Sequence, residues 1–141
     1  MTADDPYDLA RFVTAQEPVF ERVRAELRRG RKASHWMWFV FPQIAGLGSS
    51  PTAQRYAISG LEEARAYLAH PVLGPRLREC AELAAAVTTG GAAEVFGRPD
   101  DMKLRSSMTL FARADPDTPV FTAVLDRYFD GEPDPATLER I

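Results

Sequence analysis

The apolar residues of this chain recur every three or four positions over most of its length, and β-branched and polar residues never alternate over a sustained stretch. A repeat of about 3.6 residues is typical of an amphipathic helix, whereas a repeat of two is typical of a half-buried strand. The clearest case runs from about Asp8 to Arg29, where Leu9, Phe12, Val13, Phe20, Val23 and Leu27 share one face of a helix. We therefore predict an all-α fold, a compact domain of about six to eight short helices.

Prolines, glycines and capping residues divide this helical pattern. Pro18 is expected to bend the first helical segment or to split it in two. Gly30 follows a basic stretch and is expected to end that segment. Further helix starts are predicted at Ser50-Pro51, at Ser59 with Glu62 as its capping-box partner, and at Pro71, Asp100, Thr118-Pro119 and Asp134-Pro135.

Length and composition indicate one globular domain spanning residues 1–141, because 45% of the residues are hydrophobic and 26% are charged. Seventeen basic and twenty acidic residues leave a net charge of −3, which argues against a strongly basic nucleic-acid binder. One cysteine and two histidines cannot form a zinc site of the usual spacing, and we expect neither a metal nor a cofactor. The acidic N-terminus and the absence of a long apolar run favour a cytoplasmic protein without a membrane anchor.

The most unusual segment is Ser34-His35-Trp36-Met37-Trp38-Phe39-Val40-Phe41-Pro42-Gln43, which is expected to form a buried turn or two of helix. Aromatic side chains can stack on a flat ligand, but they also dominate protein cores. We assign Trp36, Trp38 and Gln43 as candidate ligand-binding residues, with the core as the alternative for the aromatic ones. His35 is a candidate general acid or base, and a hydrogen bond to the backbone is its alternative role.

A glycine-containing loop follows, with Gly46, Gly48, Ser49 and Ser50 immediately before a predicted helix. Backbone N–H groups in such a loop, the start of the helix and two hydroxyls could together bind an anion. A plain connecting loop before a capped helix is the alternative.

Three further polar residues lie on helical apolar faces or at their edges. Lys103 and Ser107 are one turn apart, and Gln16 lies in the middle of the first apolar face. All three are candidate ligand-binding residues, because a buried amide or hydroxyl must find a partner. The alternatives are a surface cation for Lys103 and hydrogen bonds within the core for Gln16 and Ser107.

Several motifs resemble one small bacterial family, a domain of unknown function often labelled calpastatin-like. They are the Ser34–Gln43 segment, the Gly46–Ser50 loop, Tyr56-Ala57-Ile58, Glu63–Leu68, His70–Gly74 and Asp101–Phe111. The resemblance covers about residues 9–138. It implies an all-helical single domain and no established activity.

These observations predict that the aromatic segment, the glycine loop and the Lys103 helix meet around one pocket. The ligand expected there is phosphorylated or nucleotide-like, and a hydrolase or glycosidase activity would use His35 as the acid or base. The alternative is a non-catalytic protein–protein interaction module. Binding of nucleic acid or of a membrane is not expected, and the sequence does not predict an oligomeric state.

Overall fold

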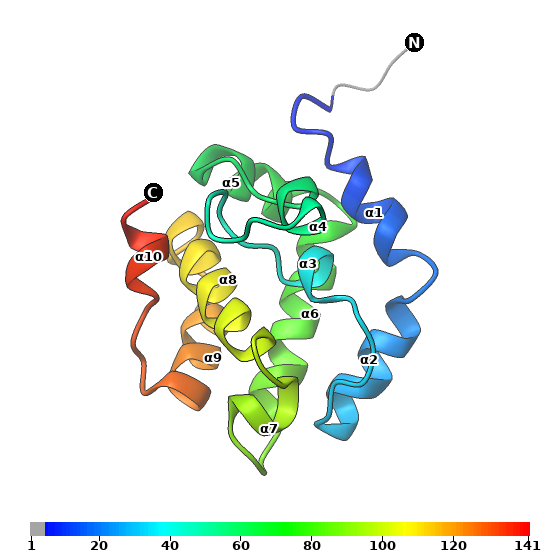
Figure 1. Ribbon diagram of the computed structural model, residues 1–141, viewed down its shortest axis with the longest axis vertical. Helices are drawn as coiled ribbons and strands as arrows, with labels where there is room; N and C mark the ends of the chain where they lie inside the picture. The colour runs from blue at the N-terminus through cyan, green and yellow to red at the C-terminus, as the bar shows by residue number, and fades with distance from the viewer. Residues whose placement is uncertain (1–4) are drawn as a thin grey trace.

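The protein is all-helical, as the apolar repeat predicts. A computed structural model describes residues 5–141, and these residues form ten helices (Figure 1). Six helices have seven or more residues, and the other four have four or five. The number exceeds the prediction because the first segment is split in two and because α7 was not predicted. The helices are α1 (Ala10–Gln16), α2 (Phe20–Arg29), α3 (Met37–Val40), α4 (Pro51–Arg55), α5 (Leu61–Ala69), α6 (Leu73–Ala86), α7 (Ala92–Phe96), α8 (Asp100–Ala114), α9 (Pro119–Phe129) and α10 (Pro135–Leu138).

The first helical segment is split at Pro18. Helix α1 ends at Gln16 and α2 begins at Phe20, with a short turn between them. Proline has no N–H to donate to the preceding turn, and here the chain changes direction instead of bending gently. Helix α2 ends at Gly30, whose φ of 76° is a left-handed conformation that glycine adopts without strain.

Helix α6 lies near the centre of the molecule and packs against α2, α5 and α9 (Figure 1). Helix α8 packs against α5, α7, α9 and α10. Between these helices the rings of Phe12, Tyr67, Phe111 and Phe121 form a continuous series, with successive centroids 5.1 to 6.0 Å apart. This core is built from residues distant in sequence, and it holds the short helices α3 and α4 at the surface of the bundle.

Local signals predicted most helix starts, with three differences, one of which is that α6 begins at Leu73 and not at Pro71. Ser50-Pro51, Thr118-Pro119 and Asp134-Pro135 precede α4, α9 and α10 as expected. The predicted capping box between Ser59 and Glu62 is wrong, because the N-cap of α5 is Gly60. The residue that accepts hydrogen bonds from the Ser59 N–H and hydroxyl is Glu63, not Glu62. Asp100 is the first residue of α8, not its N-cap.

No helix within residues 5–141 combines the length and the apolar character needed to cross a membrane. The same residues contain no group of three or more His, Cys, Asp or Glu side chains arranged to hold a metal ion.

Candidate ligand-binding groove

A buried carboxylate organises the chain that leads into α3. Glu26 on α2 is 3% exposed, and its two oxygens accept hydrogen bonds from the Ala33 and Ser34 N–H groups, the Ser34 hydroxyl and Trp36 Nε1. Burial alone would raise the pKa of Glu26, but these four hydrogen bonds outweigh it and lower the pKa to about 2. The carboxylate is therefore ionised at neutral pH and holds the residues before α3 in place.

This arrangement makes Trp36 a core residue. Its side chain is 1% exposed, its indole N–H donates to Glu26 Oε1 at 2.9 Å, and its ring packs 6.2 Å from that of Phe41. The predicted ligand contact of Trp36 has no support in this geometry, because its ring is buried and does not line the groove. The core alternative describes this residue.

Trp38, two positions further on, is only partly buried and faces the outside of the bundle. Lys103 Nζ on α8 lies 4.7 Å from the centroid of its ring, a cation–π contact. The same ammonium lies 3.5 Å from Asp100 Oδ1, whereas the nearly buried Lys32 approaches Asp100 Oδ2 to 2.8 Å. Because one carboxylate serves two lysines and is closer to Lys32, Lys103 keeps part of its positive charge uncompensated.

Trp38 and Lys103 line a groove of about 510 Å³. The groove brings together the three segments singled out in the sequence: the aromatic segment, the glycine loop and the first turns of α8. Its walls are Trp38, Gln43, Leu47, Gly48, Ser49, Ser50, Ala53, Pro99, Met102, Lys103, Ser106, Asp134 and Ala136.

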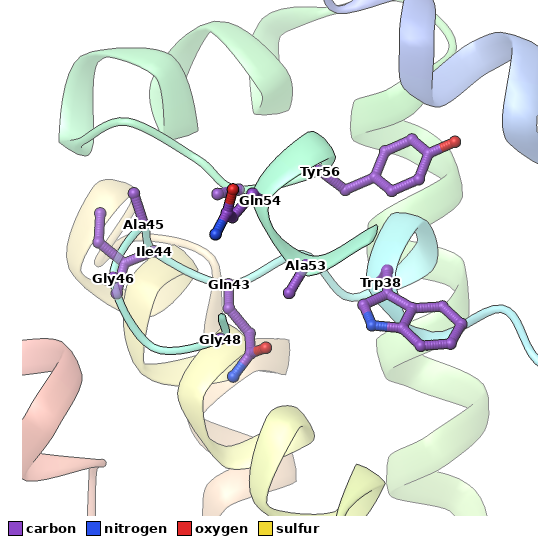
Figure 2. A pocket seen from close by; sticks show the side chains of 10 residues that line it. Trp38, Gln43, Ile44, Ala45, Gly46, Gly48, Ala53, Gln54 and Tyr56 are labelled. Atoms are coloured by element: carbon purple, nitrogen blue, oxygen red, sulfur yellow. The ribbon is translucent and has the colours of Figure 1, made fainter. Parts of the chain in front are cut away.

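A smaller pocket of about 160 Å³ adjoins this groove and shares Trp38, Gln43, Gly48 and Ala53 with it. Figure 2 shows the Gln43 amide projecting beside Gly48 and the Trp38 indole nitrogen turned toward the side on which Gln43 lies. The backbone of Gln43 is held in place because its carbonyl accepts from the Ile58 N–H at 2.9 Å. The side chain itself makes no hydrogen bond within the described residues, so its amide is free to contact a ligand.

The two glycines of the loop are required by packing. Gly46 has a φ of 98°, and a Cβ there would lie 2.9 Å from Arg140 Nε. A Cβ on Gly48 would lie 2.6 Å from Ala53 Cβ. Gly48 lines both the groove and the smaller pocket, and Gly46 lines the smaller pocket. The need for glycine at these two positions is explained without a bound ligand.

The start of α4 gives little support to the predicted anion site. This helix has five residues, and the Ser50 hydroxyl already accepts from the Ala53 N–H at 3.1 Å. A single turn has little dipole, and one of its free donors is already satisfied by the cap. Ser49 and Ser50 are exposed on the groove wall, and Lys103 is the cation that faces it.

These contacts can be compared with known proteins. A model of the family described as protein of unknown function (DUF1810) matches residues 6–141. The chain belongs to this family. The solved structure of conserved hypothetical protein Rv1873 from Mycobacterium tuberculosis is similar, with 58% sequence identity, 96% of each chain covered and a TM-score of 0.94. A search of curated proteins found no match.

These findings confirm the resemblance to a domain of unknown function and the helical fold. Neither of them carries the calpastatin-like label.

Gln16 is a structural residue of this DUF1810 chain. It is 2% exposed, and its side-chain Nε2 donates to the Phe39 carbonyl at 2.7 Å and to the Tyr67 hydroxyl at 3.2 Å, while Oε1 accepts from Arg76 at 3.3 Å. The alternative of hydrogen bonds within the core describes Gln16, because both polar atoms of its amide have partners inside the protein. Its role is to pin the backbone of α3 to the core.

Ser107 and His35 do not line the groove either. Ser107 is fully buried, and its hydroxyl has no hydrogen-bond partner among the described residues. Its predicted ligand contact has no support in this geometry, because Ser107 faces the core from α8. His35 is exposed at the start of the aromatic segment but is not among the groove residues, so the groove does not bring the predicted acid or base to a ligand.

Sequence reasoning missed the residues that α10 and its preceding turn add to the groove. Asp134 and Ala136 line it from the far end of the chain, and Met102 and Ser106 line it from α8. Asp134 carries a sequence signal, but only as the N-cap before Pro135. Nothing in the sequence pattern brings it next to the glycine loop, because that contact depends on how α10 packs on α8.

Proposed function

We propose that this protein binds a phosphorylated, nucleotide-like small molecule in the groove between the aromatic segment, the glycine loop and α8. One observation carries the proposal: Trp38, Gln43 and Lys103, which come from separate segments, converge on a single hollow of about 510 Å³. A volume of this size is within the range of small-molecule sites, and such sites combine an apolar surface with a few polar groups.

Each of the three side chains supplies a different interaction. Trp38 offers an aromatic surface for a flat ring, and Gln43 offers one donor and one acceptor to a polar ring edge. Lys103 supplies a positive charge that Asp100 compensates only in part, which favours a phosphate. The hydroxyls of Ser49 and Ser50 add hydrogen-bonding groups from the glycine loop.

The proposal is for binding and assigns no catalytic step. A hydrolase or glycosidase activity needs an acid or base within reach of the ligand, and His35 is not a groove residue. The interaction-module alternative is also less well supported. A protein interface usually needs a large apolar patch, and Met102, at 49% exposed, is the single large hydrophobic side chain that is exposed within residues 5–141.

Tryptophan fluorescence tests the proposal directly, because the chain has two tryptophans and one of them, Trp36, is sealed in the core. Titration with adenosine 5′-monophosphate or ribose 5-phosphate at low salt is expected to change the emission of Trp38. The change should disappear in Trp38→Phe. Calorimetry on the same variant would separate loss of the signal from loss of binding.

Lys103→Met tests the phosphate contact and keeps the apolar stem of the side chain. A charge-assisted hydrogen bond contributes about 1.5–3 kcal/mol, so the dissociation constant should rise by about tenfold or more. Arg22→Met is the matched control, because Arg22 is an exposed cation on α2 and is not among the groove residues. Equal weakening in both variants, or no binding by the folded wild-type protein, would refute the proposal.

A further inference from the structure

Asp134 is a buried carboxylate on the groove wall that the proposed phosphate contact does not use. It is 8% exposed, and it lies among the groove residues together with Lys103. Ionised groups are rarely buried without a partner, because desolvation disfavours the charge. No Lys, Arg or His nitrogen of the described residues lies within 4.0 Å of it; the nearby Arg105 instead pairs with Glu132 at 3.7 Å.

The two oxygens of Asp134 differ. Oδ2 lies 3.0 Å from the Ser106 hydroxyl, 3.1 Å from the Thr137 N–H and 2.6 Å from the Thr137 hydroxyl, and all three can donate to it. Oδ2 therefore caps α10 and links it to α8. Oδ1 accepts no hydrogen bond within residues 5–141, and it is not among the atoms sealed from solvent without a partner.

We infer that Asp134 Oδ1 accepts a hydrogen bond from a sugar hydroxyl of the ligand, so that the groove selects phosphorylated ribose compounds over their deoxy counterparts. Asp134 is 8% exposed and lines the groove, and Oδ1 is the oxygen of its carboxylate that has no partner within residues 5–141. A carboxylate accepts but cannot donate, and carboxylates commonly bind the hydroxyls of ribose in nucleotide sites. The inference rests on the proposed function and specifies its ligand.

A hydroxyl fits this site better than an ammonium group. The groove already contains the Lys103 ammonium, which would repel a second cation. Its other polar groups include the Gln43 amide and the Ser49 hydroxyl, which are neutral and pair with hydroxyls. A ligand with a phosphate for Lys103 and hydroxyls for Asp134 uses both charges of the groove.

The test varies the ligand first, which leaves the fold intact. Adenosine 5′-monophosphate is compared by calorimetry with 2′,3′-dideoxyadenosine 5′-monophosphate, and ribose 5-phosphate with 2-deoxyribose 5-phosphate. We expect the hydroxylated member of at least the first pair to bind about 10- to 100-fold more tightly, as expected for one hydrogen bond to a charged group. Equal affinity within both pairs, with binding still weakened in Lys103→Met, would overturn this inference and leave the proposed function standing. Failure of every ligand to bind would refute both.

Asp134→Asn then tests the residue itself. Asparagine is also a good N-cap, so its oxygen can replace Oδ2 toward Thr137, while its NH₂ replaces the free acceptor. The preference for the hydroxylated ligand should fall to a few-fold at most, because the NH₂ can donate only a neutral hydrogen bond to a sugar hydroxyl, and the affinity for the dideoxy ligand should stay the same. If this variant does not fold, Asp134→Ser, which also caps helices, replaces it. Retention of the full preference in a folded variant, or tighter binding of a 3′-amino analogue than of the hydroxylated ligand, would contradict the hydroxyl assignment.

Discussion

Replacing Glu26 by glutamine is expected to remove about 3 kcal/mol of folding stability at neutral pH. The substitution keeps the size of the side chain and one acceptor oxygen. It removes the charge that receives the Ala33 and Ser34 N–H groups, the Ser34 hydroxyl and Trp36 Nε1. Hydrogen bonds to a charged acceptor are about twice as strong as neutral ones, so the geometry can persist while the stabilisation falls.

The magnitude follows from the pKa of Glu26. The ordinary pKa is 4.5, and the folded protein lowers it to about 2. Each pKa unit corresponds to about 1.4 kcal/mol, which sums to ~3 kcal/mol. Because the pKa is lower in the folded state, this stability is fully present above about pH 4.5 and is lost as the pH falls toward about 2.

Urea unfolding of the wild type and of Glu26→Gln between pH 7 and pH 2 measures the effect. The difference in unfolding free energy should be largest at pH 7 and shrink toward zero near pH 2. Glu82→Gln, at an exposed position on α6, controls for the loss of one negative charge and should change stability by less than about 0.5 kcal/mol. A loss below about 1 kcal/mol at pH 7, or a difference that persists unchanged at pH 2, would refute the reasoning.

Three further predictions concern packing and reactivity. Gly74→Ala should destabilise the fold by about 3 kcal/mol or more, because the new Cβ would lie 2.1 Å from the Leu68 carbonyl oxygen. Gly60→Ala is the control and should be nearly neutral in thermal unfolding, because no atom lies within 4 Å of the new Cβ. Ser107→Ala should leave the unfolding free energy unchanged or raise it by up to about 1 kcal/mol, because the buried hydroxyl has no partner to lose; a clear loss would reveal a hidden hydrogen bond. Burial raises the pKa of the Cys80 thiol to about 12. A thiol-specific reagent at about pH 8 should therefore modify Cys80 only after denaturation. Rapid reaction of the native protein would contradict the burial of this thiol.

The sequence alone determined the helical class and most of the helix limits. These are local properties: the apolar repeat selects the helix, Pro18 interrupts it, and Ser50 or Asp134 caps the next one. The predicted N-caps Ser59 and Asp100 are each one residue from the observed caps, Gly60 and Pro99. Helix α6 begins two residues after the predicted start at Pro71. Shifts of one or two residues are common at helix ends, which fray. The sequence also indicated the three segments that meet at the groove, because glycines, a lysine and clustered aromatics are conspicuous in a helical chain.

Only the tertiary structure decided which individual side chains face the groove. Trp36 and Trp38 are two positions apart, which is about 200° around a helix, so one is core and the other is surface. The sequence pattern cannot show which of the two tryptophans is buried, because this depends on the hydrogen bond from Trp36 to the buried Glu26 of another helix. Gln16 on its apolar face is likewise paired within the core.

Asp134 is a groove residue that the sequence pattern does not place there. It comes from the end of the chain, its local role is to cap α10, and it reaches the groove because that helix packs on α8. Helix formation depends on neighbours within about four residues, and for that reason it can be read along the chain. The groove depends on contacts between residues that are far apart in sequence, which only the packing of the helices brings together.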